Sequence, residues 1–268
     1  MALVTLAEAT RRLAGAAPLL SDAERINYLR EARDYAREAK GIFNEQKETS
    51  REVEALIELG TACRDWVHLL KEKHQAGDDP VRQKRESEEA LREAAQLAGR
   101  INLTHRRVDA LVNLAWLDYY LLEKDEVVSE KSDVVKAIHI AEEAFPSENE
   151  MRKRPQTFGQ KGKLFVLKGH LAFREFQQTR QRITKGMPDE IVKTLYLVAE
   201  YYTQALEFNK EFALDYQGMR QAKNNIDTNL RLLNGAEMRE ICNRIQEMYP
   251  DGSVIQSFLI NRAFWLVN

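Results

Sequence analysis

The feature that most constrains the fold of this chain is a helical spacing of apolar residues that continues almost without a break. Apolar side chains recur every three or four residues in nearly every segment, and no segment alternates in the way typical of a β-strand. Only 12 glycines and 6 prolines occur in 268 residues, so the expected turns are few and the helices between them are long. These observations predict an all-α fold.

Breaks in this spacing set the expected helix boundaries. Ser21 and Asp22 are suited to cap one helix, and Pro80 fits the first turn of another. The longest expected loop covers residues 146–159. We expect helices at 4–15, 22–46, 49–74, 81–101, 105–123, 127–145, 160–183, 188–209, 211–233, 236–248 and 254–265.

Two kinds of helix alternate along the chain. Residues 54–60, EALIELG, match residues 109–115, DALVNLA, in character at every position, and residues 163–169, KLFVLKG, form a weaker third copy. The second kind carries small or apolar residues at steps of three and four, which let a neighbouring helix approach closely. These positions are Ala32, Ala36 and Ala39; Ala90, Ala94 and Leu97; Ala137, Ala141 and Ala144; and Val198, Tyr202 and Ala205.

Alternating amphipathic helices of this kind stack into a solenoid of antiparallel helical hairpins, for which we expect about ten helices. We predict a single domain over residues 1–268, with an N-terminal cap helix within 1–20, a repeat array over 22–234 and capping helices within 236–268. The terminal segment 254–268 should close the last unit. Gly60 and Ala115 should lie at equivalent close helix crossings.

The sequence resembles the tetratricopeptide repeat family. ALIELGTAC at 55–63 and ALVNLAWLDY at 110–119 look like the first helix of that repeat, and YYTQALEFNKEFALDY at 201–216 looks like its second helix. Lys210 stands where the family usually has proline, and the anchors Ala32, Ala90, Ala137 and Val198 are 58, 47 and 61 residues apart rather than the usual 34. The resemblance covers residues 22–234 and implies a tetratricopeptide-like α-solenoid that binds other proteins. A fainter likeness is to helical sensor regions of bacterial signalling ATPases.

A narrow basic stripe marks residues 161–176, KGKLFVLKGHLAFREF. Lys163, His170 and Arg174 share one helical face, and apolar residues occupy most of the rest. A helix that is apolar over so much of its surface should be enclosed by neighbours, which leaves the polar face as its only opening. In a stacked array that face would look into the groove, so we predict that these three side chains contact an anionic partner.

The stripe lies within a strongly basic segment. Residues 151–185 contain ten bases and one acid, whereas residues 119–150 contain nine acids and three bases. The basic segment would therefore either bind an acidic peptide, a carboxylate or a phosphate, or simply neutralise the acidic segment. Besides the stripe, the predicted basic patch comprises Arg152, Lys153, Arg154, Lys161, Arg180, Arg182 and Lys185.

The expected helix at 105–123 supplies further candidate partner-binding residues. Trp116, Tyr119 and Tyr120 are suited to anchor a peptide because each buries a large area and keeps a polar tip; the alternative is that they are core residues. By its resemblance to tetratricopeptide repeats, Asn113 is placed like the groove asparagines that hold a ligand's backbone.

Catalytic and metal-binding patterns are absent from the sequence. Its five histidines include no pair four residues apart, and it has no Cys-x-x-Cys, His-Glu-x-x-His or Gly-x-Ser-x-Gly motif. We therefore expect no enzyme activity, no metal and no cofactor.

Charge, cysteine content and hydropathy narrow the class of protein. The net charge of -2 gives no overall attraction to nucleic acid or membrane, and Cys63 and Cys242 lie in apolar settings typical of reduced thiols. Neither a signal peptide nor an apolar membrane-spanning segment is evident. We expect a cytoplasmic scaffold or sensor, acting alone or in a larger assembly, that binds an acidic or carboxylate-bearing segment of another protein in a concave groove. The alternative is nucleic-acid or nucleotide-anion binding through 151–185.

Overall fold

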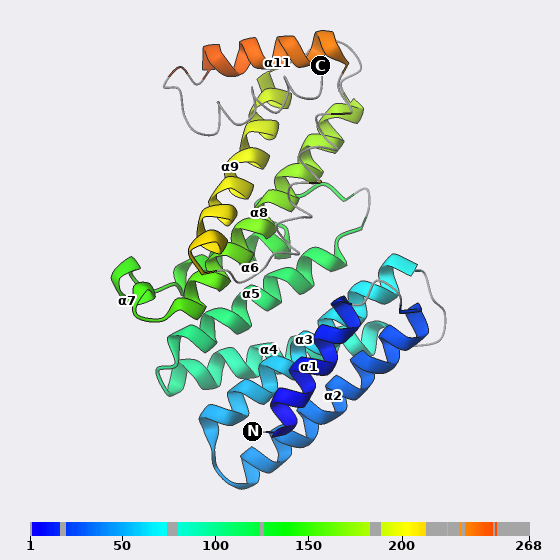
Figure 1. Cartoon of the computed structure of the whole chain (residues 1–268), viewed down its shortest axis with the longest axis vertical. Coiled ribbons are helices and arrows are strands. Elements are labelled where there is room, and N and C mark those ends of the chain that lie inside the picture. Colours follow the sequence, from blue (N-terminus) through cyan, green and yellow to red (C-terminus); the bar gives the residue numbers. More distant parts are fainter. Residues whose placement is uncertain are drawn as a thin grey trace. The chain divides into compact units, whose positions relative to one another are not determined.

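The residues that the computed structural model describes form helices joined by turns and loops, with no strand among them (Figure 1). These are residues 2–16, 20–73, 80–123, 126–182, 189–212 and 234–248, with the single residues 224, 231 and 250. The helices are α1 (Ala2–Ala16), α2 (Asp22–Glu45), α3 (Thr49–Lys73), α4 (Pro80–Arg100), α5 (Thr104–Leu121), α6 (Asp133–Glu143), α7 (Glu148–Arg152), α8 (Pro155–Arg182), α9 (Asp189–Phe212) and α11 (Gly235–Met248). The all-α prediction is confirmed. Most of the expected helix at 211–233, and all of the closing segment 254–268, lie outside the described residues.

Local sequence sets the ends of several helices. The Ser21 hydroxyl accepts a hydrogen bond from the Glu24 backbone N–H, and the Glu24 carboxylate accepts one from the Ser21 backbone N–H at 2.8 Å, which makes a capping box at the start of α2. Pro80 is the first residue of α4, as expected. Before α5 the chain turns at Asn102, whose φ of 56° lies in the left-handed region that asparagine tolerates.

Two expected boundaries were wrong. The helix expected from residue 127 begins only at Asp133, because Ser132 has an extended backbone at the N-cap position. Residues 146–159, expected as a loop, contain α7 and the first turn of α8. A capping box between Ser147 and Glu150 starts α7, and Pro155 is the first residue of α8.

Contacts divide the chain into two compact units. Unit 1 comprises Met1–Lys124 and Glu130–Thr157, and unit 2 comprises Asp125–Ser129 and Phe158–Asn268. Each unit is described by itself below.

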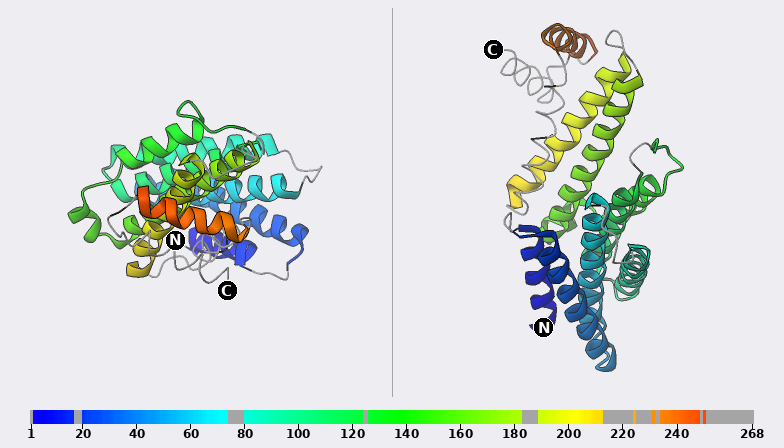
Figure 2. Two further views of the ribbon diagram at one scale, coloured as in Figure 1. Left: turned by 90° about the horizontal axis from the view of Figure 1, so that it is seen from above. Right: turned by 90° about the vertical axis from the view of Figure 1, so that its right-hand side faces the viewer.

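Unit 1 is a stack of antiparallel helical hairpins. Each helix from α1 to α6 packs on the next in sequence, and α3 also packs on both α1 and α5 (Figures 1 and 2). Helices α1, α3 and α5 therefore form one layer, whose outer side we call the first-helix face, and α2, α4 and α6 form the other layer. This arrangement is that of a helical-repeat solenoid.

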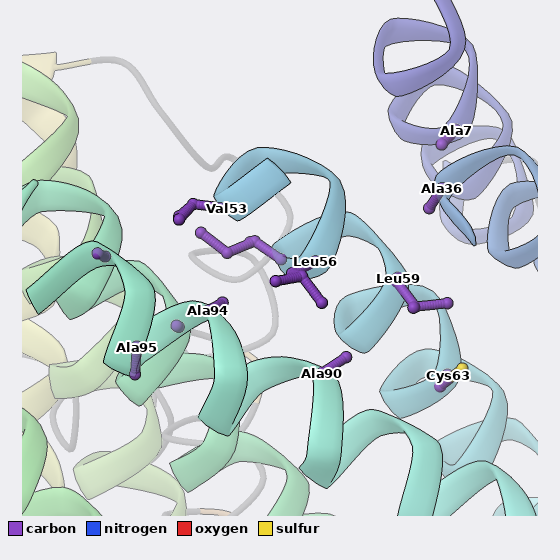
Figure 3. Close-up of a cluster of buried hydrophobic side chains, with 12 residues drawn as sticks. Ala7, Ala36, Val53, Leu56, Leu59, Cys63, Ala90, Ala94 and Ala95 are labelled. Atoms are coloured by element: carbon purple, nitrogen blue, oxygen red, sulfur yellow. The ribbon is translucent and has the colours of Figure 1, made fainter. Parts of the chain in front are cut away.

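The core of unit 1 joins leucines and valines of α3 to alanines of α4. Leu56 of α3 is completely buried and packs in one cluster with Ala90 and Ala94 (Figure 3). The predicted small-residue positions are buried in α2, α4 and α9, apart from Leu97, which is half-buried. In α6 only Ala141 of the three is buried, because α6 is short and Ala144 already lies at its C-cap.

Glycine permits the closest approach between helices. A Cβ atom at Gly60 would lie 2.5 Å from Leu91 Cγ of α4, well inside van der Waals contact. At the matching position of the third sequence copy, a Cβ atom at Gly169 would collide with the Tyr202 ring of α9. Gly60 thus lies at a close crossing, as expected, and Ala115, the equivalent residue of the second copy, is fully buried.

Unit 2 contains α8 from Phe158 onward, together with α9 and α11. The rings of Phe165 and Phe208 stack at 5.5 Å between α8 and α9. An ion pair between Arg180 and Glu237 joins α11 to α8, and Arg244 Nη1 lies 2.8 Å from Asp189 Oδ1 of α9.

We predict that Gly60→Ala lowers the free energy of unfolding by about 1–2 kcal/mol, because the cost of overpacking against buried Leu91 exceeds the gain in helix propensity. Gly41 of α2 is the matched control, since a Cβ atom there would meet nothing within 4 Å. Gly41→Ala should stabilise by about 0.5–1 kcal/mol. Urea titration measures both variants, and equal effects would contradict the close crossing.

Candidate functional site

An ion network lies on the first-helix face of unit 1. Arg11 Nε of α1 lies 3.1 Å from Glu58 Oε2, and Arg11 Nη1 lies 3.4 Å from Asp65 Oδ2, both on α3. Arg64 Nη2 lies 2.6 Å from Asp65 Oδ1. All four side chains are largely buried, and pairing offsets the cost of taking their charges out of water.

Burial and pairing act differently on the two carboxylates. Burial opposes the ionisation of Asp65, but Arg64 and Arg11 outweigh it and lower the pKa of this carboxyl. Burial raises the pKa of Glu58, and its ion pair with Arg11 offsets this only in part. Asp65 is the firmly charged member, so the network has a structural role in joining α1 to α3.

Asn113 extends this network to α5. Its buried side chain donates from Nδ2 to the Asp109 backbone oxygen at 2.8 Å and to the Asp109 carboxylate at 3.0 Å. Its Oδ1 accepts a hydrogen bond from Arg64. The amide is thus occupied within the chain, so it is not free to hold a ligand's backbone as the family resemblance implied.

The predicted aromatic residues of α5 form a cluster with a histidine of α3. The Tyr120 ring stacks on His68 at 4.0 Å and an interplanar angle of 10°, and Trp116 lies 5.5 Å from Tyr120 and 5.8 Å from Tyr119. We call His68, Trp116, Tyr119 and Tyr120 the aromatic cluster. All four are half-buried, so each ring keeps an exposed part that could meet an apolar side chain of a partner.

The predicted basic stripe of α8 does not form an open face. His170 is buried, and its Nδ1 shares a hydrogen bond with the Tyr202 hydroxyl at 2.5 Å, because α9 packs closely where Gly169 leaves room. Lys163 and Arg174 are partly exposed on either side of it. Arg174 Nη2 donates to the Glu126 backbone oxygen at 3.0 Å.

Most of the described basic patch is engaged within the chain. Arg152 pairs with Glu148, Arg154 contacts His105, Lys161 lies over the Phe208 ring, Arg180 pairs with Glu237 and Arg182 donates to Thr179. Lys153 is exposed. Lys185 lies outside the described residues. The boundary after Thr157 also assigns 152–154 to unit 1 and the later bases to unit 2, so 151–185 is not one surface of one unit.

A cleft of about 880 Å³ opens between α4 and α6, above α5, in unit 1. The sequence did not predict it. Leu111 and Leu114 of α5 and Ile140 of α6 supply apolar lining. The charged lining residues are Lys84, Glu88, Arg92, Arg100, Arg107, Asp118, Asp133 and Lys136.

Asp118 is the strongly perturbed acid of this cleft. Partial burial, together with the nearby carboxylates of Glu88 and Asp133, raises its pKa to about 6. Arg92 and Lys84 oppose this shift only in part. Around neutral pH the Asp118 carboxylate is therefore ionised in the folded chain, and this lowers the free energy of unfolding.

Sequence reasoning missed the α3 contribution to the first-helix face. The offset of 55 residues that aligns 54–60 with 109–115 also aligns Glu58 with Asn113, and Arg64 with Tyr119. Applying that offset to the α5 candidates would have pointed to these residues of α3. Nothing comparable pointed to His68.

The described residues include no group of three or more histidine, cysteine or acidic side chains that could hold a metal ion. No described helix is both long and apolar enough to cross a membrane. Cys63 and Cys242 are both free thiols, and burial raises the pKa of each, which lowers the fraction present as the reactive thiolate.

The fold defines this chain as an all-α helical-repeat protein. No protein-family model matches it, and no curated protein matches it. Among solved structures it is similar to a chain described as a circular tandem repeat protein with novel repeat topology and enhanced subunit contact surfaces. The identity is 13% and the TM-score 0.34 over 98% of this chain, which spans 63% of that protein's length. So distant a likeness adds nothing to the fold described above.

We predict that Asp118→Asn stabilises the protein at pH 7.5 by up to about 3 kcal/mol, with no such gain at pH 3. The ordinary pKa of 3.8 applies to the unfolded chain, so stability falls as pH rises from there to about 6, and the neutral amide escapes this loss. Urea titration at both pH values measures the difference. Glu89→Gln, on an exposed part of α4, is the control, and a gain for Asp118→Asn that is equal at both pH values would contradict the raised pKa.

Proposed function

We propose that this chain is a non-catalytic cytoplasmic scaffold or sensor that binds a segment of a partner protein on the first-helix face. The aromatic cluster carries the proposal. Its four half-buried rings, from two neighbouring helices, offer the kind of rigid surface on which a partner's apolar side chain is held. The resemblance to tetratricopeptide repeats, whose first helices line the binding groove, supports the same surface.

A cation beside the cluster supports a partner that carries a carboxylate. Lys71 follows His68 by one helical turn, and its Nζ donates to the backbone oxygens of Leu121 at 2.6 Å and Leu122 at 2.9 Å. The same Nζ pairs with the Glu123 carboxylate at 3.1 Å, and the Glu123 side chain is 79% exposed. A partner's carboxylate would therefore replace Glu123 in a weak surface ion pair with Lys71, while a neighbouring apolar side chain of the partner packs on the aromatic cluster.

The contacts that the basic patch makes within the chain favour protein over nucleic acid as the partner. A phosphate backbone needs several accessible cations along one surface. Among the described bases of 151–185, most already contact acids, backbone oxygens or rings of this chain.

The test is capture of a partner from a lysate of the source organism by the tagged chain. Trp116→Ala with Tyr120→Ala should weaken capture by about tenfold or more, as for the loss of hot-spot rings. Tyr201→Ala removes a half-buried ring of α9 outside the cluster and should leave capture unchanged. Thermal melting confirms that each variant is folded.

Two further arms separate the alternatives. Nuclease treatment of the lysate should have no effect, and Lys163→Glu on α8 should capture the partner as well as the unmodified chain. Capture that depends on nucleic acid or on Lys163, and survives the loss of both rings, would instead place binding on the basic segment.

A further inference from the structure

Two salt bridges close the gap between the neighbouring helices α2 and α4. Arg37 Nε of α2 lies 3.2 Å from Glu86 Oε1 of α4, and Lys40 Nζ lies 2.7 Å from Glu93 Oε2. Long side chains from both helices thus bridge the space above α3.

The next gap of the same kind, between α4 and α6, has lost both bridges. The spacing of 58 residues that aligns Ala32 with Ala90 aligns Arg37 with Ala95 and Lys40 with Ala98. The spacing of 47 residues from Ala90 to Ala137 aligns Glu86 with Asp133 and Glu93 with Ile140. Alanines cannot reach across the gap, and Ile140 has no charge to pair.

The result is the cleft of about 880 Å³ between α4 and α6, a size typical of ligand-binding sites. Its apolar part is unusual for a surface. Ile140 of α6 is 52% exposed and faces a cleft that Leu111 and Leu114 of α5 also line. An apolar side chain placed here would be removed from water on several sides.

The charges of the cleft are unbalanced in favour of a bound anion. Glu88 pairs with Arg92 at 2.7 Å, and Asp133 pairs with Lys136 at 3.0 Å. Asp118, the remaining carboxylate of the cleft, interacts with Lys84 and Arg92. In the part of the chain that the structure describes, Arg100 and Arg107 make no ion pair.

Arg100 and Arg107 lie together at one end of the cleft. Arg100 ends α4 and Arg107 lies in the first turn of α5, which the turn at Asn102 brings alongside. The Arg107 side chain passes over Gly99, with Cδ 3.8 Å from where a Cβ atom of that glycine would lie. Both arginines are exposed and suited to bind carboxylates through two hydrogen bonds each.

We infer that this cleft is a second docking site, which takes an acidic amphipathic helix of a partner protein. Helices α4 and α6 both run antiparallel to α5, so the groove between them runs along α5 and suits a helix laid lengthwise. The partner's apolar side chains would lie on Leu111 and Ile140, and its carboxylates would pair with Arg100 and Arg107. The site is distinct from the aromatic cluster and does not depend on it.

The test measures binding of a labelled helical peptide of about four turns to the full chain by fluorescence anisotropy. The peptide carries leucines at steps of three and four residues and glutamates at one end. Matched peptides carry glutamine or lysine in place of glutamate. We expect the glutamate peptide to bind at least about tenfold more tightly than either, as the loss of charge-assisted hydrogen bonds requires.

Protein variants assign the binding to the cleft. The double change Arg100→Glu with Arg107→Glu should weaken binding of the glutamate peptide by about tenfold or more. Ile140→Glu should weaken binding of all three peptides. Arg85→Glu, at an exposed position of α4 outside the cleft, should change nothing. Trp116→Ala should also change nothing, so this result is independent of the proposed function.

Three results would overturn the inference. The first is that the unmodified chain does not bind the glutamate peptide. The second is that Arg85→Glu weakens binding of this peptide as much as the double change does. The third is that a single-stranded oligo-dT displaces the peptide. Displacement would show that Arg100 and Arg107 recognise phosphate instead of carboxylate.

Discussion

The close approach of α3 to α4, repeated between α8 and α9, is the constraint on which the rest of this structure depends. At Gly60 the α3 backbone lies so near Leu91 that even a methyl group would collide, and Gly169 stands in the same relation to Tyr202. Alanines of α4 pack on α3 in the same contact, and Ala36 of α2 belongs to the same core cluster. Because neighbours then enclose α3 on most sides, its polar residues are confined to one face.

That confinement explains the ion network. Charged groups held between α1, α3 and α5 are partly removed from water, and leaving one unpaired would cost several kcal/mol. Arg11, Asp65 and Arg64 satisfy one another, and Arg64 also holds Asn113 of α5. The network therefore fixes the register of the three helices, and this register brings His68 of α3 onto the Tyr120 ring.

Binding surfaces arise where the repeat departs from its own pattern. Between α2 and α4 two salt bridges fill the gap, but at the aligned positions between α4 and α6 the bridging residues are replaced by alanine and isoleucine. The shorter spacing to α6 and its late start at Asp133 add to this difference. The same short helix leaves Ile140 exposed and places Asp133 near Asp118, where burial and the carboxylates of Asp133 and of Glu88 on α4 raise the pKa of Asp118.

The sequence by itself determined the helices, many of their ends and the close crossing at Gly60, because periodicity, capping residues and small residues act within one helix or between adjacent ones. Only the tertiary structure decided which polar residues stay open. A helical wheel puts His170 between Lys163 and Arg174, yet Tyr202, 32 residues later, covers it and bonds its ring. Asn113 is likewise taken by Arg64, 49 residues earlier. The α4–α6 cleft depends on which side chains of α4, α5 and α6 reach across the gap between α4 and α6. The pattern within one helix cannot predict this.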